Sequence, residues 1–377
     1  MSRARLIGSL KYRNLRYAQN HPLRIPRVSL LLEFLRALSL IEEEELVESR
    51  PATPEEILLF HSRDYLEALR EADRSGRVPP GARERFNIGS YENPVSPATF
   101  RGSLLATGSS VQAVELFLEG FAPFNPAGGM HHAFRDRANG FCFINDPVIA
   151  LEVLRSRGFK RILYIDLDAH HCDGVQSAYY ETDEVFTFSL HQSPDFSFPF
   201  RSGFLHERGR GKGEGYTLNV PLPPGVTDDE FLFLLEGTLP RIAEFFDPEV
   251  YVVQLGTDAL LEDPLSRLYL SNRGLLEAFR LVREILGEGI YLGGGGYNPV
   301  ALVRAWTLIW CEISGREPPR RITPQAEGVL RSVGWENPRE EVDEEPLYRT
   351  LQDSWRGSGV RDEIRKLAVE LKALCYS

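Results

Sequence analysis

Two carboxylates and an imidazole follow a run of apolar residues near the middle of this 377-residue chain. Ile162 to Ile165 is rich in β-branched and aromatic residues, which is typical of a buried strand in a parallel sheet. Asp166, Asp168 and His170 come next at intervals of two, so an extended backbone would place their side chains on one face. In open α/β sheets, catalytic groups collect at the carboxyl ends of strands. The spacing therefore favours a functional site over an ordinary polar turn.

Three further stretches place polar side chains after apolar or glycine-rich runs. His131 and His132 follow two glycines, which let the backbone approach a neighbour closely. Asp258 follows an apolar run, where it could be a ligand or simply a helix N-cap. Tyr297 follows four glycines that lack the pattern of a phosphate-binding loop. These glycines are better explained as a tight turn that lets the tyrosine project into a pocket.

Together these groups could form the site of a metal hydrolase. Asp168, His170 and Asp258 would supply oxygen and nitrogen donors and leave a coordination position open, as catalytic zinc sites do. A bound metal lowers the pKa of its water to about 7 and polarises a carbonyl. Asp and His accept both zinc and ferrous iron, so the sequence leaves the identity of the metal open.

Proton transfer would fall to the two adjacent histidines. His131 and His132 suit that task if carboxylates orient them, and Asp166 and Asp173 are near the expected ligands in the sequence. A phenol such as that of Tyr297 would donate a hydrogen bond to the developing oxyanion. The expected chemistry is hydrolysis of an amide.

Strands and helices alternate along the chain, which is the pattern of a parallel sheet covered on both faces. Thr53 to Glu56 has the residues of a helix start, and residues 75–100 are expected to form a long surface loop. The predicted strands are 6–10, 121–125, 162–165, 184–191, 216–222, 250–255 and 290–292. The predicted helices are 29–40, 62–71, 102–118, 147–155, 228–245, 275–286 and 300–313.

Composition excludes several classes of protein. The net charge of −11, from 43 basic and 54 acidic residues without a basic block, argues against nucleic-acid binding and suits a basic or acetylated-basic substrate. No stretch has the ~18 apolar residues of a membrane span, and the start lacks a signal peptide. The four cysteines, Cys142, Cys172, Cys311 and Cys375, form no disulfide framework. We expect a cytoplasmic protein, monomeric or weakly oligomeric.

Six motifs resemble, in order and spacing, those of the zinc-dependent histone deacetylase family, from about residue 5 to residue 315. Within that family the chain looks most like the bacterial histone deacetylase-like proteins and, more distantly, the acetoin-utilisation deacetylases. The resemblance implies one α/β domain over residues 1–377, with an eight-stranded parallel sheet like that of arginase and with residues 316–377 packed outside. The motifs are Gly128–His132, Gly140–Asp146, Ile165–Gly174, Ser189–His191, Gly256–Asp258 and Gly293–Tyr297.

The resemblance also implies roles for the site residues. Zinc would be held by Asp168, His170 and Asp258, and an acetyl-lysine amide would be hydrolysed with Tyr297 polarising its carbonyl. The general base and then acid would be His132, paired with Asp173. His131, paired with Asp166, would be its electrostatic partner. Hydroxamates should inhibit such an enzyme.

Further positions match the substrate channel and ion sites of that family. Phe141 and Phe198 match the aromatic channel walls, with Gly140 and Leu265 beside them, and Glu92 matches an acid at the rim. An internal cavity is implied at Arg27 and Met130, the latter standing where many relatives have leucine. Potassium is implied in two places: at Asp166, Asp168, His170 and Ser189, and near Tyr179, Thr182, Val185 and Tyr216.

Two alternatives to an acetyl-lysine deacetylase differ in class. A binuclear manganese ureohydrolase also carries an Asp-x-His signature, but it needs two aspartates two residues apart on the later strand, and Asp258 has Gly256 and Leu260 at those distances. A non-catalytic acetyl-amine binder would not require Tyr297 or the histidine-carboxylate pairs. The substrate itself stays open, because an acetylated protein, an acetylpolyamine or another small amide would each fit a narrow channel.

Overall fold

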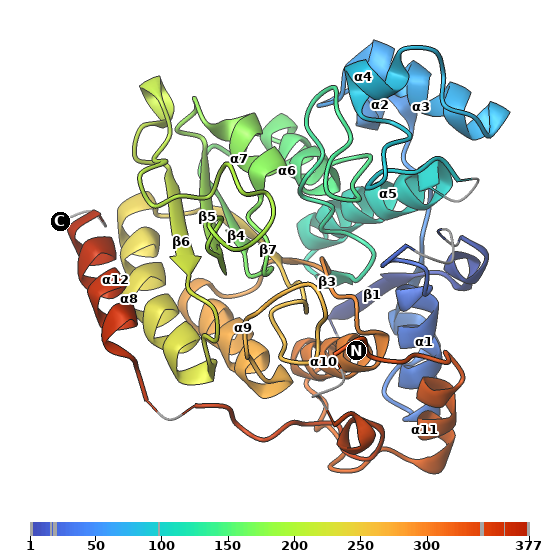
Figure 1. Ribbon diagram of the computed structural model, residues 1–377, viewed down its shortest axis with the longest axis vertical. Helices are drawn as coiled ribbons and strands as arrows, with labels where there is room; N and C mark the ends of the chain where they lie inside the picture. Colours follow the sequence, from blue (N-terminus) through green and yellow to red (C-terminus); the bar gives the residue numbers. More distant parts are fainter. Residues whose placement is uncertain are drawn as a thin grey trace.

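The computed structural model describes residues 3–15, 17, 21–96, 99–339, 343–357 and 359–374. Eight parallel strands form one sheet in the order β2-β1-β3-β8-β7-β4-β5-β6, which lies at the centre of the molecule (Figure 1). The predicted single α/β domain with an eight-stranded parallel sheet is confirmed. The strands are β1 Ala4–Gly8, β2 Leu46–Glu48, β3 Ala122–Asn125, β4 Ile162–Asp166, β5 Val185–Gln192, β6 Thr217–Leu222, β7 Val250–Gln254 and β8 Ile290–Leu292.

Seven of these strands were expected from apolar runs, with small shifts at their ends. β1 begins two residues before the predicted range, because Ala4 and Leu6 are buried while Leu10 is exposed and lies in a short 3-10 helix. β2 was not expected. It is a three-residue edge strand without a buried side chain, so it pairs with β1 but leaves no hydrophobic pattern.

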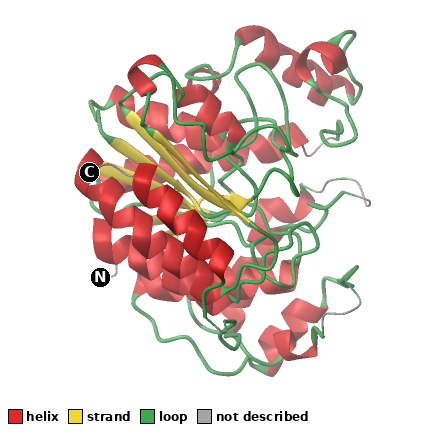
Figure 2. Cartoon of the chain, turned by 60° about the vertical axis from the view of Figure 1, so that its left-hand side comes forward, coloured by secondary structure: helices red, strands yellow, loops and turns green. Residues whose placement is uncertain are grey.

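Helices cover both faces of the sheet, as Figure 2 shows. α1, α8, α9 and α10 pack on one face, and α5, α6 and α7 pack on the other. The helices are α1 Arg27–Ala37, α2 Pro54–Ile57, α3 Arg63–Ser75, α4 Ala82–Phe86, α5 Thr99–Leu118, α6 Asp146–Ser156, α7 Asp173–Tyr179, α8 Asp228–Phe246, α9 Asn272–Leu286, α10 Pro299–Ser314, α11 Pro324–Arg331 and α12 Asp362–Leu374.

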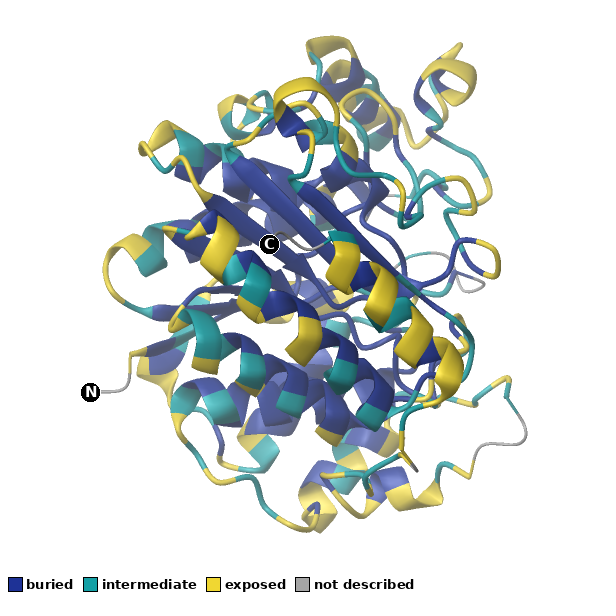
Figure 3. Cartoon of the chain, turned by 90° about the vertical axis from the view of Figure 1, so that its left-hand side faces the viewer, coloured by how far each residue is buried: buried dark blue, intermediate teal, exposed yellow. Residues whose placement is uncertain are grey.

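The strands alternate their side chains between two hydrophobic cores. In β4, Leu163 and Ile165 face the core of α8 to α10, whereas Ile162 and Tyr164 face that of α5 and α6. The central strands are accordingly buried along their length in Figure 3. A strand that is apolar on both faces is the signature of a doubly covered parallel sheet, which is why the continuous apolar runs were informative.

Residues 75–100 were expected to be an open loop, and this prediction is wrong in part. The short helix α4 interrupts the segment, since Ala82, Phe86 and Ile88 are buried in the core that α3 and α5 share. The helix ends at Asn87 in the left-handed conformation (φ 57°). Beyond it Tyr91, next to Glu92, is 92% exposed, whereas Ile88 and Asn93 are fully buried.

The C-terminal segment lies on the α8 to α10 side of the molecule. α11 packs on α1, and α12 packs on α8. A buried ion pair fastens the chain between them: the guanidinium of Arg304 in α10 lies 2.6 Å from Asp353 and also donates to the carbonyl of Thr350. The side chains of Arg304 and Asp353 are 1% and 8% exposed.

Replacing Asp353 with alanine should therefore lower the free energy of unfolding by about 3–5 kcal/mol, because it leaves the charge of Arg304 buried without its partner. Urea unfolding monitored by fluorescence measures this difference. The control is Glu327→Ala, which removes an exposed pair with Arg331 and should cost less than about 1 kcal/mol. Equal urea midpoints for the two variants would contradict the expectation that the buried pair contributes more to stability than the exposed pair.

The structure contains no helix, among the residues it describes, that is both long and apolar enough to cross a membrane. Three cysteines, Cys142, Cys172 and Cys311, are buried free thiols, and Cys375 lies outside the described residues.

Candidate active site

The site lies where four neighbouring strands end. Asn125, Leu292, Gln254 and Asp166 are the last residues of β3, β8, β7 and β4, and they pair with one another across the sheet. The chain after each of these strands carries one part of the site. Parallel strands bring their carboxyl ends to the same edge, so residues far apart in sequence meet there.

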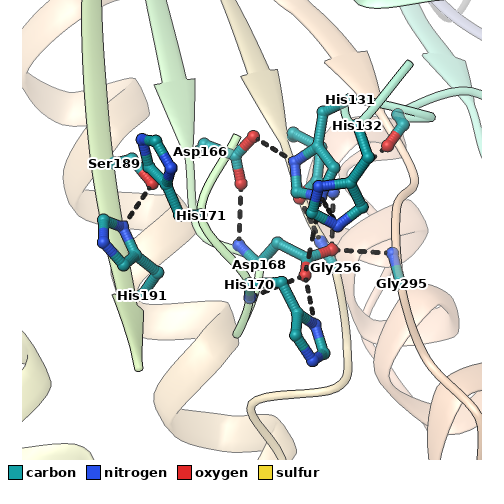
Figure 4. Close-up of polar contacts among 12 residues, drawn as sticks. His131, His132, Asp166, Asp168, His170, His171, Ser189, His191, Gly256 and Gly295 are labelled. Carbon is teal, nitrogen blue, oxygen red and sulfur yellow. Dashed lines mark hydrogen bonds and ion pairs between the residues drawn. The ribbon is translucent and has the colours of Figure 1, made fainter. Parts of the chain in front are cut away.

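The three expected ligands converge at this edge, and Figure 4 shows two of them, Asp168 and His170. Donor atoms of Asp168, His170 and Asp258 all lie within 4.8 Å of one another, and all three residues are buried. The spacing predicted that an extended backbone would place Asp168 and His170 on one face. The chain is not extended here. β4 ends at Asp166, whose carboxylate accepts from the Asp168 N–H (3.1 Å), and Asp168 accepts in turn from the His170 N–H (3.0 Å). These local bonds bend the chain and aim the two side chains at Asp258.

Backbone and amide donors fix the remaining carboxylate oxygens. Oδ2 of Asp168 accepts from the Gln254 side chain (2.6 Å) and from the Gly295 N–H (2.8 Å). Oδ1 of Asp258 accepts from the Ala169 N–H (2.9 Å). One oxygen of each aspartate is thus held in place, and Oδ1 of Asp168 and Oδ2 of Asp258 lie 3.2 and 3.0 Å from Nδ1 of His170.

The electrostatics of this cluster suit a cation. Burial lowers the pKa of His170, but the carboxylates of Asp258 and Asp168 outweigh it and hold the pKa well above its usual value. Burial also raises the pKa of Asp258 to about 6, with the charge of Asp168 adding to the effect. Two buried carboxylates around one imidazole nitrogen attract positive charge, and this donor set fits a divalent metal.

The adjacent histidines each meet a carboxylate. Nδ1 of His131 lies 2.7 Å from Asp166, and Nδ1 of His132 lies 2.7 Å from Asp173. Their Nε2 atoms are 3.0 Å apart. The Nε2 atoms therefore face the interior of the site, while the Nδ1 atoms are engaged by the orienting carboxylates.

The two imidazoles have opposite proton affinities. Burial lowers the pKa of His131, but Asp166 and Asp168 raise it overall to about 9. Burial lowers the pKa of His132 well below its usual value, and positive charge on His131 and His170 adds to that effect. His132 is accordingly the neutral member of the pair, which is the form able to accept a proton.

Tyr297 completes the site from the turn after β8. Its backbone N–H donates to the buried carboxylate of Asp263 (2.7 Å), and its ring meets those of Phe141 and His170 edge-on, with centroids 5.9 and 6.5 Å apart. Burial raises the pKa of its phenol well above 10, with Asp258 and Asp168 adding to the effect, so the group stays protonated and can donate. Gly295 is required in this turn, because a Cβ there would lie 2.0 Å from Oδ2 of Asp258.

A cavity of about 250 Å³ leads from the surface to these groups. Phe141 and Phe198 line it, and the ring of Phe198 lies edge-on to His132 at 4.8 Å. The neighbouring Phe196 and Phe200 also line the cavity but are 54% and 60% exposed, so they belong to its outer part. The other lining residues are Glu92, His132, Gly140, His170, Ser197, Leu265 and Tyr297.

Backbone conformation brings the channel wall close to the histidines. Gly140 has φ +50°, and a Cβ there would lie 2.6 Å from the His132 ring. Phe141 has φ +68°, which few residues with a side chain adopt. Contacts of its ring with Tyr297 and His21 hold it in that conformation.

A smaller cavity of about 20 Å³ lies against the same groups and is lined by Arg27, Met130, His131, Asp168 and Tyr297, among others. Arg27 donates to the carbonyls of Gly294 (2.8 Å) and Gly296 (3.1 Å). It is therefore not the exposed arginine that its position after Pro26 would also have allowed.

The residues expected around potassium form two groups. Asp166 and Ser189 are paired neighbours on β4 and β5, close to Asp168 and His170. In the second group, Tyr179 and Thr182 lie at the end of α7 and in the following turn. Val185 begins β5, and Tyr216 immediately precedes β6.

Comparison with known proteins identifies the family. The family model described as "Histone deacetylase domain" matches residues 21–313. The chain belongs to the histone deacetylase family. It is 35% identical over 327 residues to the acetoin utilization protein AcuC of Bacillus subtilis, covering 85% of this chain and 84% of that protein. It is 34% identical to histone deacetylase 8 of Xenopus tropicalis, over 78% of this chain and 79% of that protein.

Solved histone deacetylase relatives share the whole fold. The crystal structure of an HDAC homolog from Aquifex aeolicus superposes with a TM-score of 0.97 at 61% identity, over 98% of this chain and 99% of that one. The structure of an HDAC homolog complexed with SAHA, a hydroxamate, matches with the same values. The protein is accordingly a hydrolase that acts on acetylated amides.

The sequence analysis did not predict four residues that contact the site. Gln254 donates to Asp168, and Asp263 accepts from the Tyr297 backbone. Tyr164 donates to Asp166, and Asn139 donates to Asp173. Gln254 could have been noticed as a polar residue that ends an apolar strand. The other three offer no comparable signal in the sequence.

Proposed function

We propose that this histone deacetylase relative hydrolyses acetyl-lysine side chains with a zinc ion held by Asp168, His170 and Asp258. One observation carries the proposal: an aromatic-lined cavity leads to a buried three-ligand cluster that is flanked by two histidine–carboxylate pairs and a tyrosine. Ferrous iron has the same ligand preferences and is the alternative metal.

The side chains divide the reaction among them. When bound, the metal supplies a Lewis acid that activates water and polarises the acetyl carbonyl. Nε2 of His132 accepts the proton of the attacking water and later returns it to the leaving lysine amine, while Asp173 holds the ring in place. The Tyr297 hydroxyl donates to the carbonyl oxygen as it gains negative charge. His131, paired with Asp166, contributes charge beside His132.

The channel walls explain why an acylated rather than a free lysine is accepted. Phe141 and Phe198 surround the apolar stem of the substrate, and Gly140 leaves room for it. Taking a charged ammonium out of water into this apolar passage costs far more free energy than taking in a neutral amide. Glu92 at the outer part can accept hydrogen bonds from the substrate backbone.

The ureohydrolase alternative finds no support in the site. Position 256, where a second bridging carboxylate would be needed, is a glycine, and a Cβ there would lie 2.2 Å from Oδ2 of Asp168. Leu260, the other candidate position, is buried in the hydrophobic core. We further propose that potassium binds at both groups of residues expected for it. One group includes the proposed zinc ligands Asp168 and His170, and the other lies around Tyr179, Thr182, Val185 and Tyr216.

The proposed function is tested by assaying the zinc-loaded protein against acetyl-lysine peptides and acetylpolyamines, with and without SAHA. We expect peptide hydrolysis that the hydroxamate inhibits. Preference for acetylpolyamines would change the assigned substrate but keep the chemistry. Urea release from a guanidino compound at two metal ions per chain would support the ureohydrolase instead.

A further inference from the structure

Three side chains after α11 contact the turn 261–263 or the helix cap that follows Tyr297, and a fourth, Trp335, donates to one of the three. We call Trp335, Asn337, Arg339 and Glu344 the brace. The brace lies beyond residue 313, where the match to the family model ends. Its contacts converge on Asn298, the neighbour of Tyr297, and on the turn 261–263.

The brace first fixes the turn 261–263 through its backbone. Nη1 of Arg339 donates to the carbonyls of Leu261 (2.8 Å) and Asp263 (3.2 Å). Nδ2 of Asn337 donates to the carbonyl between them, that of Glu262 (3.0 Å). Three successive carbonyls are therefore held by brace side chains, which fixes the path of a segment that has no regular secondary structure.

The turn 261–263 positions two residues of the site, Tyr297 and Leu265. The carboxylate of Asp263 is 1% exposed and accepts from the N–H groups of Tyr297 (2.7 Å) and Leu265 (2.9 Å). Leu265 lines the channel opening. A shift of the turn would therefore move the backbone of the tyrosine and the channel wall together.

The brace also holds the residue after the tyrosine. Oε1 of Glu344 accepts from Nδ2 of Asn298 (2.5 Å), with Asn337 (2.9 Å) and Trp335 (3.4 Å) as further donors. Asn298 is buried and caps α10, because its Oδ1 accepts from the N–H groups of Val300 and Ala301, both at 3.1 Å. Glu344 thereby sets the orientation of the amide that ends the tyrosine turn.

We infer that the brace is a positioning device for Tyr297, so that the C-terminal segment contributes to turnover although it touches no reacting atom. The inference rests on the proposed role of Tyr297. Its physical basis is the steep dependence of rate on geometry, since a misplacement of about 1 Å can cost about 10²-fold. A hydroxyl that donates to a developing oxyanion is subject to this dependence.

Glu344→Ala removes the acceptor shared by three brace bonds. We expect kcat for an acetyl-lysine peptide to fall about 10-fold or more, with KM and zinc content nearly unchanged. Glu344→Gln retains an acceptor oxygen for the neutral donors and should restore most of kcat. The matched control is Glu345→Ala, whose carboxylate instead pairs with Arg331 and Arg349, and which should leave kcat unaltered. Arg339→Ala tests the turn contacts independently of Glu344.

A double-mutant cycle then separates positioning from simple destabilisation. In the Tyr297→Phe background, Glu344→Ala should cause little further loss, because the group it positions is gone. A lower melting temperature with unchanged kcat in Glu344→Ala and Arg339→Ala, or equal losses in both backgrounds, would overturn the inference. Full activity of Tyr297→Phe alone would instead refute the proposed function, so the two failures are distinguishable.

Discussion

Replacing Tyr297 with phenylalanine is expected to lower kcat by about 10²- to 10³-fold, because it removes the hydrogen bond to the carbonyl oxygen that forms as negative charge develops. The phenol is available for this role, since burial keeps it protonated and its ring lies against Phe141 and His170. Steady-state kinetics with an acetyl-lysine peptide measures the effect.

The same variant should keep its zinc and its hydroxamate affinity to within a small factor, because the three ligands and the channel walls are untouched. Tyr291→Phe is a suitable control because it also removes one buried phenol hydroxyl. That hydroxyl donates to Glu288 and accepts from the Gly289 N–H, at the end of β8 away from the Tyr297 turn. Near-normal turnover of Tyr297→Phe would remove the tyrosine from its proposed role.

Replacing Asp168 with alanine should abolish activity together with metal binding. Asp168 supplies one of the three donors, and its carboxylate also joins Gln254, Gly295 and His170. Metal analysis after dialysis should show about one ion per chain in the wild type and almost none in the variant. Added zinc should not restore the rate at concentrations that saturate the wild type.

The contrasting variant is His132→Ala, which removes the proposed base but leaves all three ligands. It should retain zinc while losing about 10²- to 10⁴-fold in kcat. The pair of variants therefore separates metal binding from proton transfer. Zinc retention by Asp168→Ala, or zinc loss by His132→Ala, would show that the ligand assignment is wrong.

The sequence predicted the position of the site because its strands are apolar on both faces and polar at one end. Ile162 to Ile165 could be recognised as a strand, and the polar residues that follow it could be recognised as candidates for a functional site. The geometry between Asp166 and His170 could not be foreseen, since it depends on side chains that accept from the backbone two residues on. Periodicity describes regular structure, and it fails where local hydrogen bonds bend the chain.

Other features were missed because they depend on contacts between distant segments. The edge strand β2 exists through pairing with β1, and α4 exists because Phe86 and Ile88 find a core between α3 and α5. Asp263 resembles any loop acid until the Tyr297 N–H is seen to meet it. Which phenylalanine lines the inner part of the channel could be decided only from the structure, in which Phe198 faces His132 while Phe196 and Phe200 are exposed.

In this fold, the residues proposed for the reaction and those proposed for substrate recognition come from different parts of the chain. The first group follows the paired strand ends Asn125, Leu292, Gln254 and Asp166. The proposed ligands, the histidines and the tyrosine all follow these central strands, whereas Glu92, Phe196 and Phe200 come from long connections that contribute nothing to the sheet. Under the proposed function, substitutions of the exposed residues Phe196, Phe200 and Glu92 should change which amines are admitted, provided that Phe198 keeps its contact with His132. The architecture thus offers a starting point for engineering substrate preference by exchanging surface loops.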